Sequence, residues 1–292
     1  MSINEKDILK RVKAIEIKTR GIVNQHFSGE YHSRFKGRGM NFSEVREYSY
    51  GDDVRTIDWN VSARMKAPFI KVFEEERELV LMLLVDISGS GSFGSDKTFR
   101  REIATEIAAV LAFSAIKNND KVGLILFSDK IEKFVPPKKG KAHVFRIIRE
   151  LIYHKEESHG TDIGGALEYL NRVQKKRCSA FLISDFLSSE YEKELQIVSN
   201  RHDLVGIDLS DKAEENLDKL GFIELYDNES GKTLIVDLKS RKNRETFRNN
   251  IKNHNLKKEK LFNKNKVDKV IIDINSSYIK PLMTFFKSRS RS

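Results

Sequence analysis

Hydrophobic positions in the middle of the chain follow two alternating patterns, one typical of buried strands and one typical of amphipathic helices. Residues 79–85 form a continuous apolar run, which predicts a strand buried on both faces. Residues 97–117 then carry apolar side chains along one stripe at helical spacing. Further strands are predicted at 122–127, 131–135, 179–183 and 204–209, and further helices at 142–154, 162–175 and 191–200. The alternation predicts an α/β fold, with a mostly parallel sheet and helices on both of its faces.

The patterns on either side of this region are less regular. Residues 3–22 have the spacing of an amphipathic helix, whereas residues 27–78 are rich in Gly, Arg and aromatic side chains and predict turns and short strands. After residue 210 we expect a hairpin, a basic helix, a strand and a last helix, at 222–226 with 233–238, at 240–263, at 267–274 and up to Phe286. Three parts are therefore predicted: an N-terminal segment 1–78, a core 79–210, and a C-terminal part 211–292 that completes the core.

Composition and charge place the protein among soluble, globular chains. Hydrophobic residues make up 39% and charged residues 33% of the 292, with only 4 Pro. The formal net charge is +10. The basic excess is densest at Lys257, Lys258, Lys260, Lys264, Lys266 and Lys269. Because both signs are mixed elsewhere, we expect these lysines to form a solvated helix face, with nucleic-acid binding as a less favoured alternative.

The single cysteine and the lengths of the apolar runs bear on the cellular compartment. Cys178 cannot form an internal disulfide, which suits a reducing environment. Residues 1–20 alternate charged and apolar side chains without a signal-peptide core, and no apolar run of the sequence is long enough to span a bilayer. We therefore expect a cytoplasmic protein that does not insert into membranes.

Oxygen-bearing side chains follow two of the predicted strands and precede one predicted helix. Three of them stand at alternate positions directly after the strand 79–85, one precedes the helix 162–175, and one follows the strand 179–183. In an open α/β sheet the carboxyl ends of the strands form the ligand crevice, and Mg²⁺ prefers oxygen ligands. The sequence therefore predicts a Mg²⁺ or Mn²⁺ site at this edge. The candidate ligands are Asp86, Ser88, Ser90, Thr161 and Asp185.

These five residues resemble the metal-ion-dependent adhesion site of von Willebrand factor A domains. That site combines a DxSxS sequence, a later Thr-Asp pair and an Asp at the end of a strand, and all of these stand here in the same order. The resemblance implies a von Willebrand A-like, Rossmann-type fold. We expect the five side chains to leave one position on the metal open, to be filled by an Asp or Glu of a partner protein.

The segment before the core resembles a second family pattern. Residues 51–59 read GDDVRTIDW and, with Arg46, Tyr48 and residues 62–64, are similar to the hallmark of the DUF58 family; residues 281–289 resemble the C-terminal end of that family. The resemblance implies a bacterial protein that works with MoxR-type AAA+ ATPases and other von Willebrand A proteins, in chaperone-like or metal-insertion assemblies. The candidate partner-binding residues in this segment are Arg46, Asp52, Arg55, Asp58, Trp59 and Arg64.

The acidic residues of the same segment have both a catalytic and a structural interpretation. Asp52, Asp53 and Asp58 could act as paired carboxylates in metal-assisted hydrolysis, but such residues more often cap turns or pair with arginines. The neighbouring arginines are Arg46, Arg55 and Arg64. We favour the structural interpretation, and we expect Trp59 to anchor the segment on the core; an exposed Trp59 would instead suit an interface.

The function predicted from these patterns is that of a non-enzymatic, metal-dependent protein-binding adaptor. One alternative is a metal-dependent phosphatase or nuclease that uses Asp86 and Asp185, and another is nucleic-acid binding through the Lys-rich region. The phosphatase is disfavoured because Ser88 stands where haloacid-dehalogenase-like chemistry requires a second Asp. The sequence contains no Walker A motif, so ATP hydrolysis would come from a partner.

Overall fold

The structure of the protein, a computed structural model, describes most of the chain after residue 40. The described residues are 22, 40–75, 79–88, 97–154, 160–188, 191–210, 222–227 and 232–290. They fall into two compact units: residues 40–75 belong to a smaller unit, and the residues from Val80 onward belong to a larger one. Of the predicted helix 3–22, only Ile22 is described, and its side chain is buried.

The smaller unit is a two-stranded antiparallel ribbon with helical turns between its strands. Strand β1 (Met40–Glu47) pairs with β2 (Phe69–Glu75), and the connection holds the 3₁₀ turn η1 (Val54–Thr56) and the helix α2 (Trp59–Met65). Short strands and turns agree with the prediction, but α2 was not predicted. It forms because Asp58 caps its first N–H groups and Lys66 ends it in a left-handed conformation at φ 57°.

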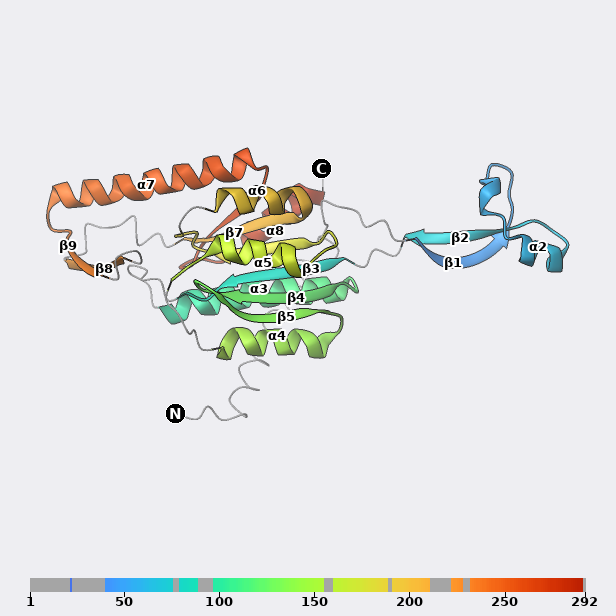
Figure 1. Ribbon diagram of the computed structural model, residues 1–292, viewed down its shortest axis with the longest axis horizontal. Helices are drawn as coiled ribbons and strands as arrows, with labels where there is room; N and C mark the ends of the chain where they lie inside the picture. Colours follow the sequence, from blue (N-terminus) through green and yellow to red (C-terminus); the bar gives the residue numbers. More distant parts are fainter. Residues whose placement is uncertain are drawn as a thin grey trace. The chain divides into compact units, whose positions relative to one another are not determined.

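The larger unit is built around a six-stranded sheet (Figure 1). Its strands are β3 (Val80–Asp86), β4 (Lys121–Phe127), β5 (Ile131–Lys138), β6 (Ser179–Ser184), β7 (Asp203–Ser210) and β10 (Asp268–Asp273). They lie in the order β10-β7-β6-β3-β4-β5, and all neighbours run parallel except β4 and β5. The predicted mostly parallel α/β sheet is confirmed, with β3 near its centre.

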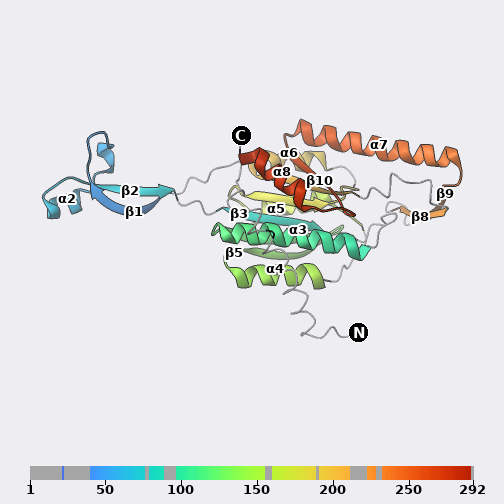
Figure 2. The same cartoon turned by 180° about the vertical axis from the view of Figure 1, so that it is seen from behind.

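Helices cover both faces of this sheet, as predicted (Figures 1 and 2). Buried side chains group α3 (Lys97–Lys117), α4 (Lys141–Tyr153) and α8 (Ile279–Ser290) on one face. They group α5 (Ile163–Val173), α6 (Glu192–Arg201) and α7 (Arg241–Lys264) on the other. Both faces of the central strands are therefore shielded from water. This explains why β3 is an uninterrupted apolar run rather than an alternating one.

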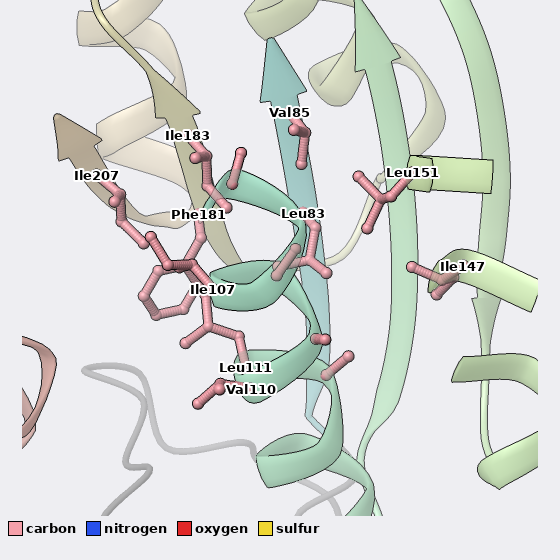
Figure 3. Packing of buried hydrophobic residues seen from close by; sticks show 14 of the residues in the cluster. Leu83, Val85, Ile107, Val110, Leu111, Ile147, Leu151, Phe181, Ile183 and Ile207 are labelled. Carbon is pink, nitrogen blue, oxygen red and sulfur yellow. The ribbon is translucent and has the colours of Figure 1, made fainter. Parts of the chain in front are cut away.

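The core on the α3 face contains every second residue of the central strands (Figure 3). Ile107 and Leu111 of α3 lie over Leu83 and Phe181 of the sheet, and all four side chains are fully or almost fully buried. The intervening strand residues, such as Met82, point to the opposite face and join the second cluster. This packing fixes the register of the parallel strands, and with it the relative positions of their carboxyl ends.

The C-terminal part adds one strand and two helices to the core and a hairpin of its own. Strand β10 extends the sheet next to β7, α8 covers the α3 face, and α7 packs on the opposite face. The hairpin of β8 (Phe222–Asp227) and β9 (Lys232–Asp237) forms a separate two-stranded sheet; its predicted turn, residues 228–231, lies outside the described residues.

Two expectations for individual residues differ from the structure. Strand β5 continues through Pro136 and Pro137 to Lys138; it lies at the edge of the sheet, where prolines are tolerated because an edge N–H needs no partner strand. Lys258 is buried rather than solvated, because its ammonium group lies 2.6 Å from the carboxylate of Asp208. The expectation of a uniformly solvated lysine face is therefore wrong at this position.

Candidate metal site at the carboxyl edge of the sheet

The predicted metal ligands lie on loops that the sheet brings to one edge. Asp86 is the last residue of β3, Asp185 follows the neighbouring strand β6, and Thr161 stands just before α5. Since β3 and β6 pair in parallel, their carboxyl ends lie side by side.

Ser88 connects the first and second loops. Its hydroxyl donates to Asp86 Oδ1 over 2.6 Å and lies 2.6 Å from the Thr161 hydroxyl. Its main-chain N–H also donates to Asp86 Oδ1, over 2.9 Å. The three side chains therefore form one hydrogen-bonded group, although Ser88 and Thr161 are 73 positions apart in the sequence.

Ser184 connects the third loop to the first. This buried serine donates from Oγ to Asp86 Oδ2 over 2.7 Å and accepts a hydrogen bond from the Phe186 N–H over 3.0 Å. Its role was not predicted from the sequence. The available signal was a hydroxyl that follows four apolar strand residues, directly before the candidate ligand Asp185.

Asp185 is held by two donors. Its Oδ1 accepts a hydrogen bond from the Leu187 N–H over 3.0 Å, and its Oδ2 accepts one from Arg100 Nη1 over 2.5 Å. The Arg100 and Asp185 side chains are only 13% and 9% exposed. Arg100, which lies in the first turn of α3, was also not predicted from the sequence.

Ionisation of the Asp86 carboxyl group is unfavourable at this edge of the sheet. Burial and, second, the negative charge of Asp185 raise the pKa of Asp86 to about 7, against the hydrogen bonds donated by Ser88 and Ser184. A carboxyl group whose charge is costly to bury, next to a second carboxylate, is stabilised by a cation.

Loops from two other strands hold Thr161 in place. The Asp162 N–H donates to the carbonyl of Ser128, after β4, and Ser188 Oγ donates to the carbonyl of Thr161 over 2.9 Å. Asp162 caps α5 as predicted, accepting from the Gly165 N–H over 2.9 Å. A Cβ at Gly165 would lie 2.5 Å from Asp162 Oδ2, so the carboxylate would have to move from its capping position.

The structure thus brings together most of the predicted ligand set. Asp86, Ser88 and Thr161 are in direct contact, and Asp185 acts on Asp86 electrostatically. Ser90 lies outside the described residues. Two carboxylates and two hydroxyls are hard oxygen donors and fit a cation such as Mg²⁺ or Mn²⁺. Across the described part of the chain, no three His, Cys, Asp or Glu side chains gather as a metal site, so this donor set depends on its hydroxyls.

The acidic residues of the smaller unit serve as caps and ion-pair partners. Arg46 pairs with both carboxylate oxygens of Asp52, at 2.7 and 2.9 Å, and these hydrogen bonds lower the pKa of Asp52. Asp53 accepts from the main-chain N–H of Arg55, and Asp58 caps α2 and lies 3.3 Å from the ammonium group of Lys71. The structural interpretation is supported, with Lys71 rather than an arginine as the ion-pair partner of Asp58.

Trp59 begins α2 with an exposed side chain. The exposed fraction of this side chain is 69%. Arg55 and Arg64 are also exposed. The packing of Trp59 on the core stays a prediction, and its exposed side chain suits the interface interpretation.

Among the helices that the structure describes, none is long and apolar enough to cross a membrane.

Comparison with known proteins identifies a family and several relatives. The family model described as "Protein of unknown function DUF58" matches residues 44–257. An uncharacterised protein of Mycobacterium tuberculosis, Rv1480, is 28% identical over 232 residues, which cover 78% of this chain and 73% of that protein.

The solved structures matched by this chain share little sequence with it. An aerotolerance-related membrane protein from Bacteroides fragilis has a TM-score of 0.47 and 13% identity, and covers 72% of this chain and 97% of its own. The conserved hypothetical protein BatB from Bacteroides thetaiotaomicron has a TM-score of 0.45 and 13% identity, and covers 73% and 100%.

Proposed function

This chain belongs to the DUF58 family, and we propose that it is a protein-binding module that uses one divalent metal to hold an acidic side chain of its partner. The observation that carries the proposal is the hydrogen-bonded group of Asp86, Ser88 and Thr161, with Asp185 beside it. Four oxygen-bearing side chains from three loops meet at the edge of the sheet where ligands bind in open α/β folds.

The residues that would hold the metal are Asp86, Ser88, Ser90, Thr161 and Asp185. When bound, Mg²⁺ or Mn²⁺ would supply a strong positive charge and an open position for an oxygen ligand. The role of the chain is to keep the donors in place before the metal arrives. Ser184 orients Asp86 through the 2.7 Å hydrogen bond, and the contacts of Asp162 and Ser188 fix the loop of Thr161.

The charge of α7 supports an acidic partner. This helix carries nine basic and two acidic residues, and it packs on the sheet through Phe262 and Lys258 near its C-terminal end. Lys258 lies beside Asp208, which pairs in register with Ser184, so the helix reaches the edge that holds the candidate metal site. A partner that offers a carboxylate to the metal would meet further positive charge there.

The family resemblance adds the kind of partner. We propose a MoxR-type AAA+ ATPase, with other von Willebrand A proteins, in a chaperone-like assembly to which this chain contributes binding and not catalysis. Ser88 supports a binding role over a phosphatase. Its hydroxyl is hydrogen-bonded to Asp86 and Thr161 and cannot act as the second acid of a haloacid-dehalogenase-like centre.

The test is binding of the purified MoxR-type ATPase encoded in the same genome, measured by biolayer interferometry with Mg²⁺ and with EDTA. We expect binding by the wild type in Mg²⁺, with at least a ~10-fold loss in EDTA or in Asp86→Ala. The control Glu168→Ala removes an exposed carboxylate from α5 and leaves the metal donors intact. Equal binding by the wild type and Asp86→Ala, with and without EDTA, would contradict the proposal, and phosphatase turnover that Asp86→Ala abolishes would favour the enzyme instead.

A further inference from the structure

Arg100 supplies a positive charge at the place where the metal would act. We infer that the Arg100 guanidinium is a built-in competitor of the metal: it neutralises Asp185 in the metal-free protein, and the metal has to displace it to gain that carboxylate. This inference rests on the proposed function and concerns the regulation of the same site.

The geometry of the ion pair is that of a strong, dehydrated contact. Nη1 of Arg100 lies 2.5 Å from Oδ2 of Asp185, and both side chains are about nine-tenths buried. The second oxygen of Asp185 accepts from the Leu187 N–H, so each oxygen already has a donor. Charge-assisted hydrogen bonds in a shielded position are stronger than neutral ones, and separating them leaves a buried charge without a partner.

The balance of charge explains why the guanidinium and the metal compete. When both are ionised, Asp86 and Asp185 carry two negative charges, and the charge of Asp185 disfavours that of Asp86. One guanidinium cancels half of that charge, whereas a divalent metal cancels all of it. With the metal and the guanidinium both in contact with the carboxylates, the centre would carry a net positive charge in a partly dehydrated crevice, which is unfavourable.

This competition couples the metal to the partner. A carboxylate from the partner that reaches the metal also brings negative charge close to Arg100, so the guanidinium gains a new counter-ion when it leaves Asp185. Partner binding should therefore tighten metal binding, and the metal should tighten partner binding by the same factor. Without a partner, the site would bind metal weakly.

The chain offers a matched control for the role of a buried arginine. Arg289 of α8 pairs with Asp203 at 2.6 Å, and the two side chains are 12% and 2% exposed, much like Arg100 and Asp185. Asp203 begins β7, whereas Asp185 follows the end of the parallel neighbour β6, so the two pairs lie at opposite edges of the sheet. Loss of Arg289 should therefore lower stability without acting on the metal donors.

The experiment is titration of Mn²⁺ into the purified protein, with free Mn²⁺ measured by electron paramagnetic resonance, for the wild type, Arg100→Gln, Arg100→Lys and Arg289→Gln. We expect Arg100→Gln to bind Mn²⁺ ~10-fold more tightly than the wild type, because a like charge next to the metal is removed. Arg100→Lys, which keeps the charge, and Arg289→Gln should both stay within about threefold of the wild type.

Each outcome separates the inference from the proposed function. Equal or weaker binding by Arg100→Gln, with clear binding by the wild type, would overturn the competition and leave the metal site standing. No binding by any variant at up to about 10 mM Mn²⁺ would overturn both. If Arg100→Gln does not fold, the ¹⁵N-guanidinium spectrum of the wild type decides: Mg²⁺ should shift the Arg100 Nε–H resonance, and an unchanged resonance in the Mg²⁺-bound protein would overturn the inference.

Discussion

Ser184 Oγ donates a 2.7 Å hydrogen bond to Asp86 Oδ2, and this contact ties the end of β6 to the end of β3. The same hydroxyl accepts from the Phe186 N–H, so one buried serine joins the first ligand loop to the third. Neither loop alone would fix the position of the Asp86 carboxylate. Ser184 is therefore a positioning residue for the candidate site.

Replacing Ser184 with alanine tests this role. Ser184→Ala removes a donor from a buried carboxylate, and we expect the free energy of unfolding to fall by about 1–3 kcal/mol. Metal affinity should fall as well, because Asp86 is less well oriented. Urea unfolding and Mn²⁺ titration measure the two effects. The control Ser199→Ala, at a partly exposed position of α6, should change neither by more than about 0.5 kcal/mol; an unchanged Ser184→Ala protein would contradict the positioning role.

Metal binding should be visible as thermal stabilisation. For a dissociation constant of about 1 mM, about 10 mM Mg²⁺ stabilises the folded protein by roughly 1.4 kcal/mol, or a few degrees in Tm. Differential scanning calorimetry should show this shift in the wild type and lose it in Asp86→Ala. A shift of equal size in both proteins would place the metal elsewhere on the chain.

The pKa of Asp86, raised to about 7 chiefly by burial, predicts how the metal-free protein responds to pH. The folded state holds a proton on Asp86 at pH values where the unfolded chain has released it, so stability falls as pH rises from about 4 to about 7. Asp86→Asn removes the buried charge, and at pH 8 without metal it should be more stable than the wild type by on the order of 1–3 kcal/mol.

Chemical unfolding at pH 5 and pH 8 in EDTA measures this dependence. The wild type should lose stability between the two values, and Asp86→Asn should lose less. Added Mg²⁺ should reverse the order at pH 8, because the wild type alone keeps the charged ligand. If the Asp86→Asn protein is less stable than the wild type at pH 8 in EDTA, the buried Asp86 charge does not destabilise the folded state.

The parts of the fold that were predicted are those in which local pattern and tertiary packing agree. Helix α3 was predicted with its observed bounds, because Ile107 and Leu111 repeat at helical spacing and face the sheet. The continuous apolar run of β3 indicated a buried strand, because helices cover both faces of the sheet there. The residues Asp86, Ser88 and Thr161 were predicted from the order of the family motif together with the end of a buried strand, and the structure brings their side chains into contact.

The parts that were not predicted depend on single tertiary contacts. Arg100 and Asp185 are 85 positions apart, and no periodicity in the sequence pairs them. Lys258 lies in a helix of strongly basic composition, so its burial follows only from the position of Asp208 on β7. Phe186 adopts φ 60°, which its residue type does not indicate; its ring packs against Phe262, 5.1 Å between centroids.

The buried ion pair of Lys258 and Asp208 should matter far more for stability than an exposed pair on the same helix. Their side chains are 6% and 4% exposed, so Lys258→Met leaves the Asp208 carboxylate buried without its partner and should cost about 3–5 kcal/mol. Lys264 and Glu192 also lie 2.6 Å apart but are 71% and 51% exposed, and Lys264→Met should cost at most about 1 kcal/mol.

Urea unfolding of the two variants and of the double variant Lys258→Met/Asp208→Asn measures the difference. The double variant should recover much of the loss, because it removes the second charge as well. Similar costs for Lys258→Met and Lys264→Met would show that water reaches Asp208.

Trp59 should contribute to partner binding and hardly to stability. Its side chain is largely exposed on α2, so Trp59→Ala removes little packing, and we expect the free energy of unfolding to change by less than about 0.5 kcal/mol. An exposed Trp in the family hallmark is the kind of side chain that dominates interfaces, where its loss often costs 2 kcal/mol or more, roughly a 30-fold loss of affinity.

The measurement is binding of the MoxR-type ATPase by Trp59→Ala, beside Tyr50→Ala as a second exposed aromatic in the same unit. Unchanged binding by both variants would exclude this surface from the interface, whereas a loss confined to Trp59→Ala would place α2 at its centre.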